Sequence, residues 1–107
     1  MKLEKLYYRL KSLIADNVEL HVRDHADKYG GKACVEVSLI SSTNSYHWTT
    51  FRAETVEDAL RKAIDKLRHP DKNYVDENGK VWKAKESSIY SAEHTRTFLR
   101  KTQQGLD

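Results

Sequence analysis

The sequence predicts a single α+β domain over residues 1–107, with two helices and a three-stranded antiparallel meander in the order α-β-β-β-α. Two observations predict this class. Apolar residues recur at helical spacing in residues 2–15 and 55–67, whereas apolar and polar residues alternate in the stretches between them. The length suits one hydrophobic core, because two cores of half this size would each be marginal. We assign this core to residues 1–68 and expect residues 69–107 to add a β-hairpin and a C-terminal helix, which extend the core or form an arm.

The first helix is predicted over residues 2–15, where an apolar stripe lies among charged residues and Asp16-Asn17 follows as a stop. The stripe consists of Leu3, Leu6, Tyr7, Leu10, Leu13 and Ile14. A strand follows over residues 18–23, in which every second residue is apolar, as in a strand with one buried face. Its apolar residues Val18, Leu20 and Val22 alternate with Glu19, His21 and Arg23.

Two further strands are predicted over residues 33–40 and 46–53. A polar turn with Gly30-Gly31 precedes the former, and the polar residues 41–45 connect the two. An antiparallel meander is the simplest arrangement, because consecutive strands most often pair with each other. Two helices cover only one face of so small a sheet, so the other face is predicted to be open unless the C-terminal segment crosses it.

The second helix is predicted to begin at Thr55 and to end before Pro70. Threonine is a favourable N-cap residue, and Asp58 three positions later completes a weak capping box. The apolar stripe of this helix consists of Val56, Leu60, Ala63, Ile64 and Leu67.

The C-terminal segment is predicted to contain a hairpin and a last helix. Asn78-Gly79 lies between the short apolar segments 74–75 and 81–82, and both residues tolerate the positive φ that a hairpin turn requires. The last helix is expected to begin after a cap at Ser88 or Ser91, to run to about Lys101, and to be anchored by Ala92, Phe98 and Leu99.

The open sheet face carries the main functional signal. If Phe51 points into the core, strand alternation places Trp48 on the opposite, open face. Exposed aromatic residues beside arginine are typical anchors of protein–protein interfaces. We therefore expect a non-enzymatic binding protein that docks on a protein partner through this face, with a homodimer through the same face as an alternative. The residues expected to bind the partner are Tyr46, Trp48, Arg52, His21 and Arg23.

No motif in the sequence predicts catalysis, a metal site or a cofactor. The chain has no phosphate-binding glycine loop, no nucleophile elbow and no His-Glu-x-x-His pattern. His21 and His25 would lie ~13 Å apart on one face of a strand, too far to share a metal ion. The single cysteine, Cys34, excludes an internal disulfide. We therefore expect neither enzymatic activity nor a cofactor, and the small size suits an accessory or inhibitor protein of a phage or mobile element.

The charge distribution leaves nucleic acid as an alternative partner. Nineteen Lys and Arg residues against 16 Asp and Glu give a net charge of +3, and the isoelectric point is about 9.0. Acidic and basic residues alternate along the chain, whereas a phosphate-binding surface usually concentrates its basic residues. In this alternative, bases stack on the open-face aromatic residues and phosphates bind a basic C-terminal patch. The patch would consist of Lys80, Lys83, Lys85, Arg96, Arg100 and Lys101.

The hydropathy pattern predicts a cytoplasmic protein with no membrane attachment. No apolar run is long enough to span a bilayer. The N-terminal residues are charged throughout, where a signal peptide would have an unbroken apolar stretch.

The α-β-β-β-α order of residues 1–68 resembles the double-stranded-RNA-binding domain in topology and length. This resemblance implies a sheet with two helices on one face. In that family, a lysine cluster at the start of the second helix contacts RNA phosphates. Residues 54–58 of this chain, Glu-Thr-Val-Glu-Asp, occupy the matching place. Members of that fold without the lysine cluster tend to bind proteins, so the resemblance favours a protein partner.

Residues 69–73, His-Pro-Asp-Lys-Asn, resemble the loop that follows a charged helix in J-domain co-chaperones. In that family the His-Pro-Asp triplet stimulates the ATPase of a partner chaperone. The resemblance implies a third function, in which His69, Pro70 and Asp71 would contact the chaperone. A J-domain has a helix on each side of this helix and loop, whereas this sequence predicts strands before it and a hairpin after it.

Overall fold

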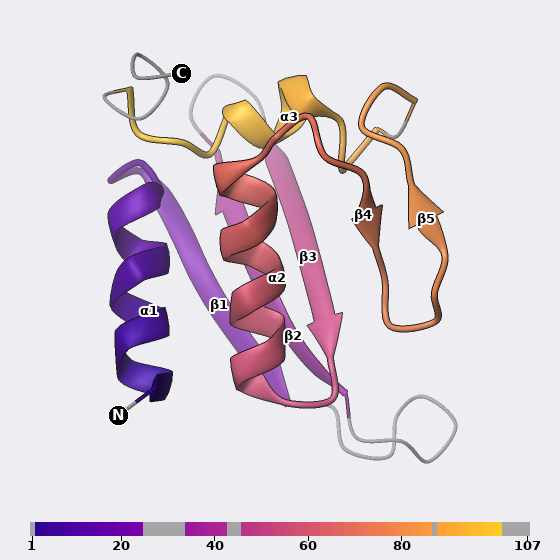
Figure 1. Cartoon of the computed structure of the whole chain (residues 1–107). Coiled ribbons are helices and arrows are strands. Elements are labelled where there is room, and N and C mark those ends of the chain that lie inside the picture. Colours follow the sequence, from indigo (N-terminus) through magenta and orange to yellow (C-terminus); the bar gives the residue numbers. More distant parts are fainter. Residues whose placement is uncertain (1, 25–33, 43–45, 87, 102–107) are drawn as a thin grey trace.

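The chain folds as a helix, a three-stranded antiparallel meander, a second helix, and then a small hairpin and a short helix (Figure 1). This computed structural model describes residues 2–24, 34–42, 46–86 and 88–101, so His25 and the Gly30-Gly31 turn lie outside the described residues. The helices are α1 (Lys2–Leu13), α2 (Val56–Arg68) and α3 (Ala92–Arg96). The strands are β1 (Val18–Asp24), β2 (Val35–Ser41), β3 (His47–Ala53), β4 (Tyr74–Val75) and β5 (Val81–Trp82).

The sheet has the order β1-β2-β3 and confirms the predicted meander. Val37 lies in the central strand opposite Val22 on one side and Phe51 on the other, which sets the inner face of the sheet. α1 and α2 lie side by side over that inner face (Figure 1). Burial of apolar side chains between the helices and the sheet forms the core, in which Val37 and Phe51 are almost completely inaccessible to solvent.

α2 follows the predicted pattern closely. The Thr55 hydroxyl accepts a hydrogen bond from the Asp58 amide at 3.1 Å, so the predicted N-cap is present. The apolar stripe buries Leu60 and Ile64 against the sheet. The helix ends at Arg68, and the His69 amide still donates to the Asp65 carbonyl as the C-cap.

The C-terminal segment extends the core. Tyr74 packs edge-on against Phe51, with their ring centroids 5.3 Å apart, and Tyr90 lies 4.3 Å from the Tyr74 ring. In the β4–β5 turn, the Asp76 carboxylate accepts hydrogen bonds from the backbone beyond it, and Gly79 adopts a φ of +81°. The predicted hairpin is therefore present, closed by a turn that the Asp76 side chain organises.

The last helix is shorter than predicted. Ser91 caps it, but the helix ends at Arg96 and does not continue to Lys101. Leu99 then forms an isolated antiparallel bridge with Ile14. The same bridge accounts for the end of α1 at Leu13, because the backbone there bonds to the C-terminal segment. The Ala15 amide donates to the Phe98 carbonyl, and the Leu13 carbonyl accepts from the Arg100 amide. No helix within the described ranges is long and apolar enough to cross a membrane.

Candidate functional site

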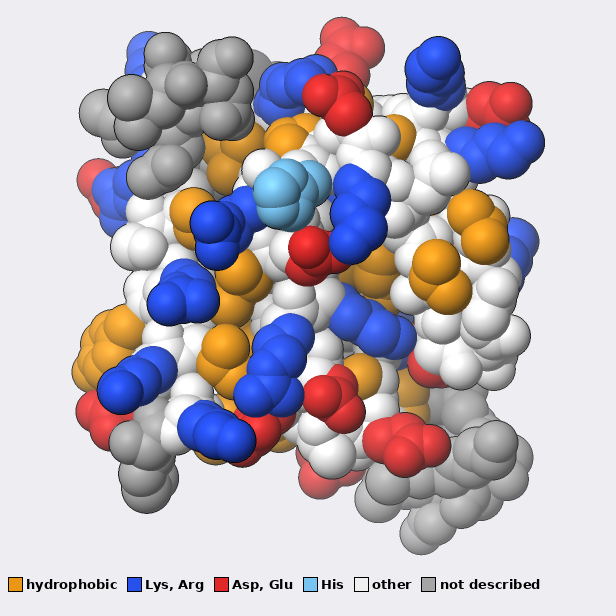
Figure 2. Space-filling model, in the orientation of Figure 1, with side chains coloured by type: hydrophobic (Ala, Val, Ile, Leu, Met, Phe, Trp, Pro, Cys, Tyr) orange, Lys and Arg blue, Asp and Glu red, His pale blue; other side chains and the backbone are white. Residues whose placement is uncertain are grey.

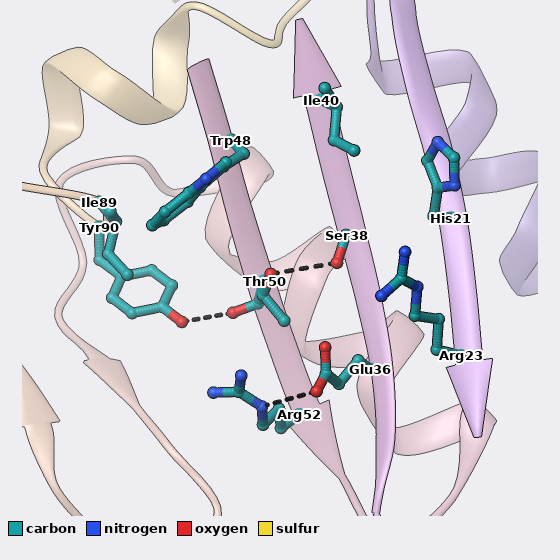
Figure 3. A pocket seen from close by; sticks show the side chains of 10 residues that line it. All are labelled: His21, Arg23, Glu36, Ser38, Ile40, Trp48, Thr50, Arg52, Ile89 and Tyr90. Atoms are coloured by element: carbon teal, nitrogen blue, oxygen red, sulfur yellow. Dashed lines mark hydrogen bonds and ion pairs between the residues drawn. The ribbon is translucent and has the colours of Figure 1, made fainter. Parts of the chain in front are cut away.

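The described part of the C-terminal segment does not cross the face of the sheet opposite the helices, which is one of the two arrangements that the sequence left open (Figure 3). We call this face the open face. Its side chains form three rows across β1, β2 and β3 because the strands pair in register. The rows are Glu19, Ile40 and Trp48; His21, Ser38 and Thr50; and Arg23, Glu36 and Arg52.

One end of the open face is apolar and aromatic. Trp48 lies opposite Ile40 on the neighbouring strand and leaves 45% of its surface exposed. Tyr46, just before β3, is 64% exposed. Ile89 from the C-terminal segment and Trp48 both line a hollow in this face (Figure 3). These exposures confirm that Trp48 is not a core residue.

The middle of the open face is polar and rigidly connected. The Ser38 and Thr50 hydroxyls share a hydrogen bond of 3.1 Å across the strands. The Tyr90 hydroxyl donates to the Thr50 carbonyl (Figure 3). The Thr49 hydroxyl donates to the Ile89 carbonyl at 3.3 Å. The segment around Tyr90 is therefore fastened along β3, at the border of the open face and not across it.

The other end of the open face carries alternating charges. The Arg52 guanidinium donates to the Glu36 carboxylate at 3.2 Å, and only 11% of the Glu36 side chain is exposed. Arg23 lies opposite Glu36 on the other side of the central strand. In the other two rows, His21 Nε2 lies 3.6 Å from the Glu19 carboxylate. Acidic and basic groups thus balance one another across the face.

A hollow of about 370 Å³ joins these two ends. The predicted residues Trp48, Arg52, His21 and Arg23 all line it, whereas the fifth predicted residue, Tyr46, is not among its lining residues. A hollow with an aromatic wall and a few oriented polar groups can receive a protruding side chain from a partner.

The basic residues of the nucleic-acid alternative are distributed over several elements. Lys80 lies in the hairpin turn, with its ammonium 4.1 Å from the Trp82 ring centroid. Arg96 forms a two-oxygen ion pair with Asp71, and Arg100 pairs with Asp16 at 3.0 Å. Figure 1 shows the hairpin on one side of the molecule and the chain beyond α3 on the other, beside α1. Lys83 and Lys85 follow β5, and Lys101 follows Arg100 near α1.

The His-Pro-Asp loop has a clear structural role. Lys66 is 2% exposed, and its ammonium donates to the carbonyls of Pro70 and Lys72 and holds the loop against α2. Asp71 is engaged by Arg96. His69 is exposed at the C-cap, and β4 follows the loop where a J-domain has a long helix.

Cys34 and the described acidic and histidine side chains are the remaining chemically reactive groups. Burial raises the pKa of the Cys34 thiol, with Glu77 as the next contribution, and this keeps the sulfur protonated. Across the described ranges, no three His, Cys, Asp or Glu side chains are grouped closely enough to hold a metal ion.

The helix side of the molecule contains two features that sequence reasoning did not single out. Four basic residues and one acidic residue of α1 are exposed, namely Lys2, Lys5, Arg9, Lys11 and Glu4. Figure 2 shows Lys and Arg side chains over both helices, with hydrophobic side chains between them. A second hollow, lined almost entirely by apolar atoms, lies at the N-terminal end of α1. Its signal in the sequence was the position of two consecutive tyrosines, Tyr7 and Tyr8, at the margin of the apolar stripe.

Comparison of the chain with known protein families, with curated proteins and with solved structures finds no match.

Proposed function

We propose that the chain is a non-enzymatic binding protein that docks on a protein partner through the open face. The observation that carries the proposal is the exposed Trp48 side chain at the wall of a hollow that also contains two arginines. Tryptophan and arginine dominate the binding energy of many protein interfaces. A rigid sheet also limits the entropy lost on binding, because its side chains are already ordered.

The charge of the open face supports a protein partner over a nucleic acid. Glu19 and Glu36 accompany Arg23 and Arg52, so the face offers no surplus of positive charge to phosphates. An alternation of acidic and basic groups beside an aromatic anchor gives directional complementarity to a protein surface.

The test is capture of a partner by the immobilised chain from the cells that produce it, in the presence of nuclease. We expect the wild type and the helix-side control Arg61→Ala to retain the same protein. Trp48→Ala should not retain it. Retention by Trp48→Ala as strong as by the wild type would contradict the proposal. Homodimers through this face would be distinguished by sedimentation, since Trp48→Ala would then convert a dimer into a monomer.

Nucleic acid is the second candidate, and the exposed basic residues of α1 favour it. Binding of labelled single-stranded and duplex DNA and RNA between roughly 50 and 200 mM salt separates the two candidates, because several phosphate contacts produce a steep loss of affinity over that range. We expect weak binding at the lowest salt concentration. Tight binding that falls steeply with salt would favour nucleic acid.

A further inference from the structure

The outer edge of β1 is a second surface, separate from the open face. β1 is a terminal strand of the sheet, and no strand in the described part of the chain pairs with its outer side. The Val18 amide donates to the Ala15 carbonyl at 3.0 Å, so it is not available to β2. Along a strand, the backbone groups of every second residue point in the same direction. The amide and carbonyl groups of Leu20 and Val22 therefore point away from β2, like the Val18 amide, and lie at the outer edge. Such an edge is a template for a further strand.

α1 and β1 diverge toward the N-terminal end of the helix (Figure 1). Burial follows this divergence: Leu10 in α1 is fully buried, whereas Leu3 and Tyr7 are each about 40% exposed. In β1, Val18 is buried, yet Val22 on the same inner face is 45% exposed. Two helices of ~10 Å diameter are also wider than three strands spaced ~4.8 Å apart. α1 therefore extends beyond the sheet that it covers.

The space that this divergence leaves is the apolar hollow at the end of α1, with a volume of about 320 Å³. Its lining residues are Leu3, Glu4, Tyr7, Tyr8, Val22, Val56 and Leu60. A segment that binds here would have to form backbone hydrogen bonds with the strand edge and place apolar side chains in the adjoining hollow. One kind of occupant supplies both, namely an extended segment with an apolar residue at every second position.

We propose that the edge of β1 binds an extended segment of a partner protein, which adds antiparallel to it as a fourth strand beneath the N-terminal half of α1. The apolar residues of the segment face Tyr7 and Val22, and its polar residues continue the open face. The charges of β1 set the pattern of these polar residues: a basic residue opposite Glu19 and an acidic residue opposite Arg23. A second copy of the whole chain fits less well, because its own α1 would enter the same space.

The sequence of β1 itself meets this requirement and provides the probe. In an antiparallel register centred on His21, glutamate lies opposite arginine and leucine lies opposite valine. The probe is therefore an acetylated heptapeptide with the sequence of residues 18–24, VELHVRD. The control is VRLHVED, in which the two charged residues are exchanged and like charges face each other.

The experiment is a titration of the isotope-labelled full chain with each peptide, followed through backbone amide shifts. We expect VELHVRD to shift the amides of Leu20 and Val22, and VRLHVED to bind roughly three- to tenfold more weakly, as two cross-strand charge pairs predict. Tyr7→Ala should weaken binding of VELHVRD, and Trp48→Ala should leave it unchanged. A peptide with proline at its fifth position, which removes an edge hydrogen bond, should not bind.

Several results would overturn this proposal. They are the absence of any shift, shifts confined to the open face around Trp48, and equal binding of the two charged peptides. A dimer of the chain alone that Tyr7→Ala dissociates would assign the edge to a second copy. None of these results bears on the capture experiment for the open face, because that experiment depends on Trp48 and not on Tyr7.

Discussion

At the scale of single residues, Phe51 and Trp48 of β3 lie on opposite faces of the sheet and have opposite roles. Phe51 is 1% exposed and packs under α2, whereas Trp48 is 45% exposed on the other face. The sequence predicted this division because a residue three positions away on a strand points to the opposite side. It also predicted that His21 and Arg23 would share the face of Trp48, and the pairing register confirms this.

Truncation of these two aromatic residues should therefore differ in its effect on folding. We expect Trp48→Ala to lower the free energy of unfolding by about 1 kcal/mol or less, as substitutions at exposed positions do. Phe51→Ala should cost about 3–5 kcal/mol, because it removes a buried ring and leaves a cavity. Urea denaturation of both variants measures the difference. A larger loss for Trp48→Ala than for Phe51→Ala would place Trp48 in the core.

Lys66 gives a residue-scale prediction that depends on pH. Burial lowers the pKa of its ammonium from 10.5 to about 8. Between these two values the unfolded chain binds more protons than the folded chain, so this residue makes stability rise as the pH increases through that window. Lys66→Met also leaves the Pro70 and Lys72 carbonyls without their donor, which costs about 1–3 kcal/mol. The cost should therefore be larger at pH 10 than at pH 7.

Urea denaturation at the two pH values tests this expectation, with Arg61→Met as an exposed control on the same helix. The control should give the same difference from the wild type at both pH values. Equal costs of Lys66→Met at pH 7 and pH 10 would show that its ammonium is not desolvated in the folded chain.

At the scale of elements, local patterns predicted α2, the strands of the meander and the β4–β5 hairpin, because their signals lie within a few residues. The apolar stripe, the cap at Thr55 and the turn around Gly79 are all local. The end of the last helix was not predictable in this way. It depends on the bridge between Leu99 and Ile14, two residues far apart in the chain. The apolar hollow beneath α1 likewise arises from the divergence of two elements, which no local pattern encodes.

The packing of α2 can be tested directly. Leu60 and Ile64 are 1% and 6% exposed, so replacing either with alanine should cost about 2–5 kcal/mol. The exposed Arg61 between them should tolerate alanine with a loss below about 0.5 kcal/mol. Urea denaturation measures all three. A loss below about 0.5 kcal/mol for Leu60→Ala would mean that α2 does not pack on the sheet.

At the scale of the whole molecule, the C-terminal segment is part of one core. Tyr74, Tyr90, Phe98 and Leu99 all belong to the same buried cluster as the sheet and the two long helices. The segment closes the β3 side of that core and leaves the open face accessible. The sequence left two arrangements of this segment open, an extension of the core or an arm, and the contact of Phe51 with Tyr74 identifies the former.

Unfolding should consequently be cooperative across the chain. Its two tryptophans, Trp48 in the sheet and Trp82 in the hairpin, report on different parts. Trp48→Phe leaves only the tryptophan fluorescence of the hairpin, and Trp82→Phe leaves only that of the sheet. In each variant, we expect the urea transition followed by fluorescence to coincide with the transition followed by circular dichroism. A hairpin signal lost at a lower urea concentration than the circular dichroism of the same variant would identify an independently unfolding arm.

The central claim is that the open face binds a protein, and site-specific photocrosslinking tests it most directly. A photoreactive phenylalanine derivative is placed at Thr50, in the middle of the open face, or at Arg61 on the helix side, in the cells that produce the protein. We predict a nuclease-resistant protein adduct from position 50, lost when Trp48→Ala is added, and none from position 61. Adducts from position 61 alone, or adducts to nucleic acid from position 50, would contradict the claim.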